Sequence, residues 1–372
     1  MQIFAAIKRR RHYTGGHKKL KKIVSFFFVL CTLIAIFSVV TPAAQRTVTV
    51  YNWGQYIGTG EDDTIDVIAE FEAKTGIKVN YITYDSNETL WTKLEMGGSN
   101  YDVIIPSDYM IGRLIANDML EKINFDNVPN YANIPDAYKN LDYDPNNEYS
   151  VPYNVGMVGL IYNKTMVEGE PTSWNIMWDS KYADDILTFN NPRDAFGIAQ
   201  FLLGLDINSN DTADWDKAAA KLTEQNAVLQ ARVNDEVFNK MEQGNAAVAA
   251  YYAGDYLTMA EVNPDLGFVY PDEGVNIFVD SVCVPKGGQN YDAAMMYINF
   301  LLEPEVALAN AEYIRYASPN TAVIDNDEYS LKGNEYLYPA KEDMPKCEYF
   351  HDLPEDVRSY YESLWDKVLV SD

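Results

Sequence analysis

Histidine and cysteine are scarce in this chain, which holds three of each in 372 residues. After residue 46 the only histidine is His351, and the only cysteines are Cys283 and Cys347. So few imidazole and thiol groups argue against a zinc site and against a nucleophile activated by histidine. The two cysteines could form a disulfide, but cysteine pairing cannot be read from a sequence.

The familiar motifs of nucleotide and hydrolase sites are also missing after residue 46. That part contains no G-x-S-x-G, no G-x-x-x-x-G-K-[ST] and no G-x-G-x-x-G. Residues 142–152 have the alternating acids and amides of a calcium loop, but Asn147 replaces its glycine and Tyr153 its bidentate glutamate. We therefore expect no metal, no cofactor and no catalytic residue.

Acidic residues are absent from the first 46 residues, which contain nine Lys or Arg. Residues 23–40 follow this basic end as an uncharged, strongly apolar run. A basic end before an apolar run is typical of an export signal. We expect residues 1–46 to be a signal peptide or a retained membrane anchor, since no clean cleavage site decides between them, and the protein to lie in the periplasm or at the cell surface.

The rest of the chain has the opposite charge, with 20 Lys or Arg against 55 Asp or Glu. Nucleic acid and anionic lipid are therefore poor partners, whereas a cationic ligand would be attracted. A merely solubilising surface would have the same composition. A length of about 325 residues exceeds what one hydrophobic core usually supports, so we expect two lobes.

Strand and helix patterns alternate along the exported part. The first predicted strand lies in the stretch 47–58, and the next two are residues 77–84 and 101–109, with helices at 62–74 and after Ser86 or Asn87 between them. Later segments predict strands at 184–191, 246–252 and 275–285, and helices at 192–203, 214–225, after Gly254 and at 291–302. This order favours an α/β fold with parallel sheets covered by helices.

Aromatic and acidic side chains gather at the predicted strand ends and neighbouring loops. Ligands of open α/β sheets bind at the carboxyl ends of strands. Each of these residues has an ordinary structural explanation by itself, but together they would form an aromatic box with acidic ends, which suits an alkyl ammonium ligand. They are Trp53, Tyr56, Ser107, Tyr109, Asp194, Tyr252, Asp255, Phe278, Asp280 and Tyr316.

An ordered series of segments resembles one known family, the spermidine/putrescine-binding proteins of bacterial ABC importers. The series covers nearly all of residues 47–320 and is specific as a set. Its segments are YNWGQYI, FEAKTGIKVNYITYDSNETLWTKL, YDVIIPSDY, DYDPNNEYSVPY, NNPRDAF, YYAGDY, FVDSVCVP, INFLLEPEVA and YASPN.

The resemblance implies a two-lobed periplasmic binding protein fold. Each lobe would be a mostly parallel sheet flanked by helices, and crossing strands would join the lobes. Lobe 1 would comprise residues 47–154 and about 279–322. Lobe 2 would comprise about 155–278 and 323–372.

The resemblance also implies a role for each box residue. Trp53 and Tyr56 would form the first-lobe wall, while Ser107 and Tyr109 would belong to the loop that closes over the ligand. Asp280, which follows the aromatic Phe278, would be the main carboxylate, with Asp255 as the second at that end and Asp194 at the far amine. Tyr252 stands where the family usually has Trp, and Tyr316 would complete the box.

Two departures bear on the preferred polyamine. Asn191, which is also expected to bind ligand, stands where spermidine-type sites have Asp, and Phe350 replaces a polar residue of that type. The pair Asp255 and Asp280 with Phe278 is more similar to the putrescine-type pattern. We therefore expect a diamine-type site.

The implied function is capture of a polyamine and its delivery to ABC permease subunits in the membrane, by a monomer that is not an enzyme. Three alternatives stay open at this point. The same fold could bind another small solute, a secreted glycosidase could use two of the carboxylates, and the binding protein could serve a sensor instead of a transporter.

Overall fold

The computed structural model describes residues 45–61, 65–97 and 100–371. The apolar run at residues 23–40, on which the export prediction depends, lies outside the described residues. Within those three ranges, no helix has the length and hydrophobicity needed to cross a membrane.

Eleven strands in the described part of the chain form one mixed sheet. Its order is β2-β1-β3-β10-β5-β8-β6-β7, while β4 and β11 pair with β10 and β9 pairs with β5. The strands are β1 (Thr47–Trp53), β2 (Lys78–Tyr84), β3 (Val103–Ile104), β4 (Leu120–Glu121), β5 (Ser150–Asn163), β6 (Ile186–Phe189), β7 (Leu229–Val233), β8 (Val248–Tyr252), β9 (Leu266–Val269), β10 (Val275–Pro285) and β11 (Cys347–Glu348).

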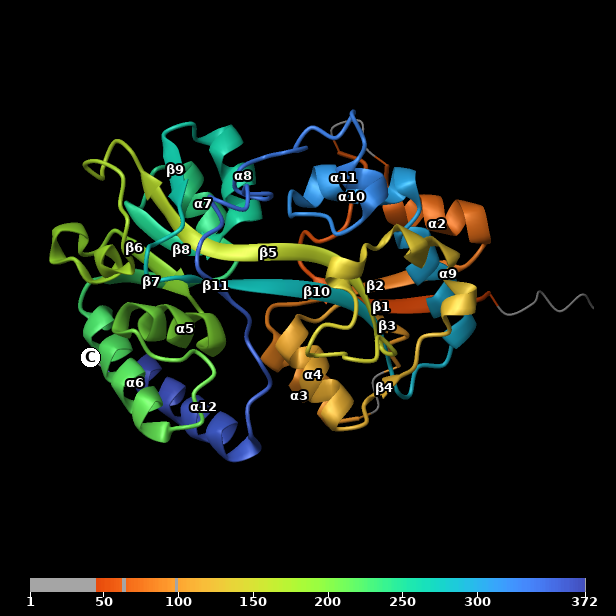
Figure 1. Cartoon of the computed structure of the whole chain (residues 1–372), viewed down its shortest axis with the longest axis horizontal. Coiled ribbons are helices and arrows are strands. Elements are labelled where there is room, and N and C mark those ends of the chain that lie inside the picture. The colour runs from red at the N-terminus through yellow and green to blue at the C-terminus, as the bar shows by residue number, and fades with distance from the viewer. Residues whose placement is uncertain (1–44, 62–64, 98–99, 372) are drawn as a thin grey trace, which may run out of the picture. The chain divides into compact units, whose positions relative to one another are not determined.

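Helices cover both faces of this sheet (Figure 1). The α-helices are α2 (Val67–Thr75), α3 (Asn87–Glu95), α4 (Asp108–Ala116), α5 (Pro192–Leu203), α6 (Thr212–Asn226), α7 (Glu236–Glu242), α8 (Ala253–Val262), α9 (Tyr291–Leu301), α10 (Pro304–Ile314), α11 (Thr321–Ile324) and α12 (Glu355–Val370). Short 3₁₀ helices are η2 (Phe125–Asn127), η3 (Pro129–Asn133), η4 (Asp136–Tyr138), η5 (Trp174–Trp178) and η6 (Ser180–Tyr182).

The long strands β5 and β10 run antiparallel through the middle of the sheet, and every residue of both is buried. The parallel strands β1, β2 and β3 join this pair where Ile104 meets Cys283 of β10. Strands β8 and β9 join at the other end, along the last residues of β5. Strand β6 pairs with β8, and β7 pairs with β6. We call β1, β2 and β3, with the helices packed on them, the β1 group, and we call β6, β7, β8 and β9, with their helices, the β6 group (Figure 1).

Several predicted elements are confirmed, among them β10 and α5 with the predicted bounds. Helix α5 begins at residue 192 because Asn191 caps it: the side-chain oxygen accepts a hydrogen bond from Asp194 N (2.9 Å), and Pro192 suits the first turn. It ends where Gly204 adopts φ 65°.

The helix predicted over 62–74 is wrong at its start, because α2 begins at Val67. Asp66 is extended and caps the helix, with its side chain accepting a hydrogen bond from Ala69 N. A bridge between Asp66 and Thr59 closes the preceding loop, which keeps residue 66 outside the helix. Helix α9 ends at Leu301, one residue before the predicted end.

Cys283 and Cys347 are both free thiols. In the sheet, Cys283 lies opposite Ser150 of β5 near one end of β10, whereas Cys347 lies opposite Val275 at the other end of β10. The length of β10 therefore separates them, which explains why they form no disulfide.

Gly156 of β5 lets an aromatic ring of the neighbouring strand lie against the backbone. A Cβ atom built on Gly156 would stand 2.2 Å from Cζ of Phe278 in β10. Real Cβ atoms do not approach a ring carbon so closely, so any side chain at residue 156 would displace Phe278.

We expect Gly156→Ala to lower the free energy of unfolding by about 1–3 kcal/mol, because overpacking of a filled core costs that much. The measurement is the urea unfolding midpoint with its slope. Gly112→Ala in α4 is the matched control, since its new Cβ would meet its nearest neighbours at an ordinary 3.8 Å. Equal midpoints for both variants would contradict the assigned contact.

Candidate functional site

A cavity of about 540 Å³ is lined by residues of both the β1 group and the β6 group. All eleven residues predicted to bind ligand line it: Trp53, Tyr56, Ser107, Tyr109, Asn191, Asp194, Tyr252, Asp255, Phe278, Asp280 and Tyr316. The fold thus brings together residues that lie up to 263 positions apart in the chain.

Asp280 is the most buried of the three predicted carboxylates, with 3% of its surface exposed. The Tyr56 hydroxyl donates a 2.6 Å hydrogen bond to its Oδ2. Its Oδ1 is buried and accepts no hydrogen bond of ordinary geometry from the described residues, although the nearby Ser107 hydroxyl helps to lower the pKa of this carboxyl. A buried carboxylate oxygen without a donor is costly, so this atom offers a strong acceptor to a cationic donor.

Asp194 stands in the first turn of α5 and lines the cavity from the β6 group. Its Oδ2 accepts hydrogen bonds from the Asn191 side chain (2.9 Å) and from the Tyr252 hydroxyl (2.8 Å). Because Asn191 also caps α5 with its oxygen, both polar atoms of that side chain are engaged with Asp194. Asn191 thereby holds the carboxylate in place.

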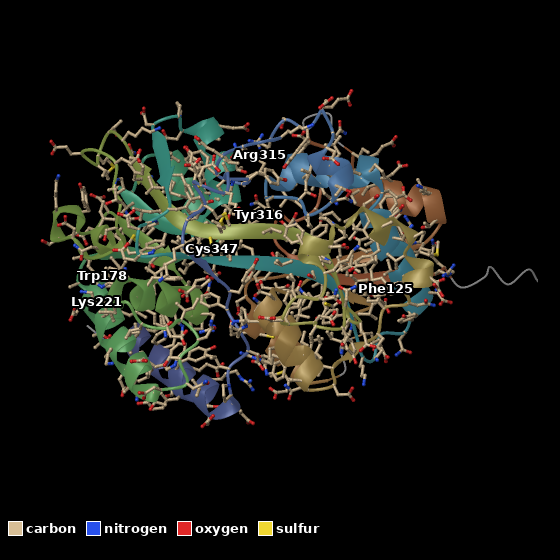
Figure 2. The ribbon with its side chains drawn as sticks, viewed as in Figure 1. Phe125, Trp178, Lys221, Arg315, Tyr316 and Cys347 are labelled. Carbon is tan, nitrogen blue, oxygen red and sulfur yellow. The ribbon has the colours of Figure 1, made fainter. Side chains whose placement is uncertain are left out.

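Asp255 lies in the first turn of α8, and the Tyr316 hydroxyl donates a 3.1 Å hydrogen bond to it. Tyr316 is held beside β5 by the bridge between Ala317 and Val155 (Figure 2). Its ring packs so closely on Gly254 that a Cβ there would stand 2.3 Å from the ring. Glycine before Asp255 therefore allows the ring and the carboxylate to meet.

The aromatic side chains form a connected set of rings around these carboxylates. Tyr56 meets Tyr316 edge to face at 5.5 Å, and Tyr252 meets Phe278 in the same manner at 5.4 Å. Tyr316 lies 6.3 Å from Phe278, which closes the set. Aromatic faces attract cations and cover methylene groups, so the rings and the carboxylates suit the same kind of ligand.

Further acidic residues line the cavity, although the sequence analysis does not include them in the site. They are Glu61, Asp85, Glu88, Asp108, Asp235, Glu261 and Glu312. Arg315 is the one basic side chain among the described lining residues, and it forms an ion pair with Glu261 at 2.6 Å. The field inside the cavity is therefore strongly negative.

Some of the other lining residues could have been predicted from the sequence. Tyr84 and Asp85 come at the carboxyl end of β2, so the rule that identifies Trp53 applies to them as well. Asp235 follows the short strand β7, which the pattern of residues 229–233 does not predict. Phe350, which the resemblance placed among the residues that bear on the preferred polyamine, lines the cavity with its ring 4.3 Å from the buried guanidinium of Arg193.

Burial dominates the titration of the three predicted carboxylates. It raises the pKa of Asp194 and of Asp280 to about 6, although hydrogen bonds from Tyr252 and Tyr56 oppose the shift. It raises the pKa of Asp255 to about 8, with the nearby Asp235 adding to the effect. A bound cation would favour the charged carboxylates and so release protons.

In the described ranges, no group of three or more His, Cys, Asp or Glu side chains is arranged to hold a metal ion. The segment that resembles a calcium loop is a turn held by Asp144, whose carboxylate accepts hydrogen bonds from the backbone N–H groups of residues 148, 149 and 150. That carboxylate is used by the turn itself.

A strand pair that joins two groups of helices and strands, with a cavity lined by both, defines a solute-binding protein. The chain belongs to the bacterial extracellular solute-binding proteins, whose family model matches residues 66–336. The two-lobed periplasmic binding protein fold and the family resemblance seen in the sequence are thereby confirmed.

Particular relatives narrow this class. The spermidine/putrescine-binding periplasmic protein of Salmonella typhimurium is 30% identical over 324 residues, which are 87% of this chain and 91% of that protein. A solved structure from Listeria monocytogenes has a TM-score of 0.83 at 34% identity, covering 88% of this chain and all of that one. The spermidine/putrescine ABC transporter substrate-binding protein of Streptococcus pneumoniae has a TM-score of 0.71 at 33% identity, covering 88% and 99%.

The raised pKa of Asp255 predicts how stability depends on pH. A carboxyl whose pKa is higher in the folded state than in the unfolded state binds its proton more tightly when folded. The stability it contributes is complete at low pH and is lost as pH rises toward about 8. We expect Asp255→Asn to flatten the fall in unfolding free energy between pH 5 and 8, by at most about 1.4 kcal/mol per pH unit.

The measurement is the urea midpoint of the ligand-free protein across that pH range. Asp126→Asn is the control, because Asp126 is exposed and its removal changes the net charge equally. The assignment is wrong if the two variants have the same pH dependence.

Proposed function

We propose that this protein captures a protonated polyamine, putrescine or spermidine, outside the cytoplasm and delivers it to an ABC importer. The unpartnered Oδ1 of Asp280 is the observation that carries the proposal. A neutral solute such as a sugar would offer only its hydroxyl groups as donors, and the several carboxylates of the cavity would compete for them. An ammonium group supplies both a charge and three donors.

The rings around the carboxylates support an alkyl amine over a metal cation. Methylene groups of a polyamine would lie against the faces of Trp53, Phe278 and Tyr316, all of which line the cavity. Each ring that faces an ammonium group contributes about 0.5–2 kcal/mol. The carboxylates would then fix the ends of the chain through charge-assisted hydrogen bonds.

The uncharged side chain of Asn191 supports a diamine-type site. Asp280 and Asp255 would hold one ammonium group, and Asp194 would hold the other. The Asn191 side chain caps α5 and orients Asp194, and it is uncharged. It therefore adds no charge beside Asp194. The distance between the acidic ends would select the length of the ligand.

Closure around the ligand would bring the two lobes together by bending at β5 and β10. We propose the lobe boundaries 47–154 with about 279–322, and about 155–278 with 323–372. Tyr316 and Asp255 belong to different lobes by this division, so their hydrogen bond would form on closure. A polyamine that contacts both lobes would stabilise the closed form, which would dock on the permease.

The periplasmic location of the Salmonella relative supports export of this chain. We propose that the protein is a monomer that works in the periplasm or at the cell surface, with residues 1–46 as its signal peptide or anchor. Its partners would be the permease subunits of the importer. Capture and release would then be its whole activity, without catalysis.

Calorimetry with putrescine, spermidine, spermine and a neutral sugar tests the proposal. We expect micromolar or tighter binding of at least one amine and none of the sugar, because only the amines offer cationic donors to the buried acids. Binding of the sugar together with submillimolar or weaker binding of every amine would contradict the function.

We expect Asp280→Asn to weaken amine binding at least tenfold, since a hydrogen bond to a charged group contributes roughly 1.5–3 kcal/mol. Tyr56→Phe should have a smaller effect, because it removes the donor to Oδ2 and leaves the charge. The exposed Asp126→Asn controls for net charge. Unchanged affinity in Asp280→Asn would mean that the main carboxylate is misassigned.

A further inference from the structure

Asp108 is a buried carboxylate of the cavity wall that the proposed ligand contacts do not use. It is the first residue of α4, and 1% of its surface is exposed. Its Oδ1 accepts a hydrogen bond from Tyr109 N (2.7 Å), and its Oδ2 accepts one from Val279 N (3.1 Å). Both oxygens therefore serve backbone groups, in contrast to the unpartnered Oδ1 of Asp280.

The hydrogen bond to Val279 lies immediately before Asp280 in β10. On the β5 side the pairing changes register between Asp280 and Ser281, and Ser281 faces Pro152. A proline has no N–H to donate, so β5 holds this part of β10 less firmly than the rest. The opposite edge must therefore fix the direction of the Asp280 side chain.

Residues 106–108 supply that fixation. Pro106 O accepts a hydrogen bond from Ser281 N (3.0 Å), and Ser107 forms a bridge with Asp280. With the Asp108 carboxylate on Val279 N, the backbone is held on both sides of Asp280. The Asp108 carboxylate thus accepts a hydrogen bond from a strand N–H group, as a backbone carbonyl of a neighbouring strand does elsewhere in the sheet.

We propose that Asp108 is a positioning residue for cation binding: its carboxylate holds Val279 and thereby aims Asp280 into the cavity. The inference rests on the proposed polyamine function. Asp108 would act through backbone geometry and would not contact the ligand. Its charge would matter less than its acceptor oxygen.

Two substitutions separate the acceptor from the charge. Asp108→Asn keeps an oxygen that can accept from Val279 N, whereas Asp108→Ala removes it. Burial raises the pKa of Asp108 to about 8, so the protonated acid at neutral pH resembles Asn in charge. We expect putrescine affinity of the full chain to fall at least tenfold in Asp108→Ala and less than threefold in Asp108→Asn.

Asp108→Ala combined with Asp280→Asn tests whether Asp108 acts through Asp280. We expect Asp108→Ala to change the remaining affinity there by less than twofold, because the side chain it positions has lost its charge. A role in folding alone would lower the unfolding midpoint without this dependence on Asp280. Calorimetry and urea unfolding of the four proteins give both readouts.

Equal losses in Asp108→Asn and Asp108→Ala, or a full loss that persists in the Asp280→Asn background, would overturn the inference. If Asp108→Ala does not fold, Asp108→Glu replaces it: the carboxyl group is kept but displaced by one methylene, and retained affinity would overturn the inference. Wild-type protein that binds no amine would instead overturn the proposed function itself.

Discussion

Strands β5 and β10 are hydrogen-bonded to each other along a path that is buried from end to end. The β1 group is attached at one end of this pair and the β6 group at the other. Phe278 and Asp280 belong to the pair itself, whereas the other site residues are carried to it by the two groups. Any movement of one group relative to the other must therefore bend these two strands close to Asp280.

Because Asp280 lies in this buried strand pair, the burial of its charge is the central constraint of the cavity. Carboxylates with raised pKa values store an unfavourable desolvation energy that a cation can relieve. The tyrosine hydroxyls that donate to Asp194 and Asp280 offset part of this cost while the site is without ligand. Ligand selection by charge and the titration of the site are thus two results of the same burial.

Other features of the wall adjust the same balance. Asn191 uses both polar atoms within the start of α5, so the Asp194 carboxylate is held by an amide and a phenol. Arg315 is neutralised by Glu261 and so leaves the negative field of the cavity nearly intact. Glycines 156 and 254 let the rings of Phe278 and Tyr316 lie directly on the backbone. These two glycines therefore help to set where the rings lie beside the acids.

The sequence by itself determined features that depend on neighbouring residues. Asn191, Pro192 and Gly204 set the ends of α5 through capping, and a segment rich in β-branched and apolar residues set β10. The strand-end rule identified Trp53 and Tyr56, and a set of ordered segments identified the family. The start of α2 was missed because the bridge between Thr59 and Asp66 is made by a loop and has no periodic pattern.

Only the tertiary structure decided which polar groups meet. Tyr56 and Asp280 are 224 residues apart, and Asp108 and Val279 are 171 apart. The separation of the two cysteines along β10 was decided in the same way. Caps and strands follow from hydrogen bonds between near neighbours, so a short segment specifies them. Contacts between distant segments depend on how whole layers pack, which no local pattern records.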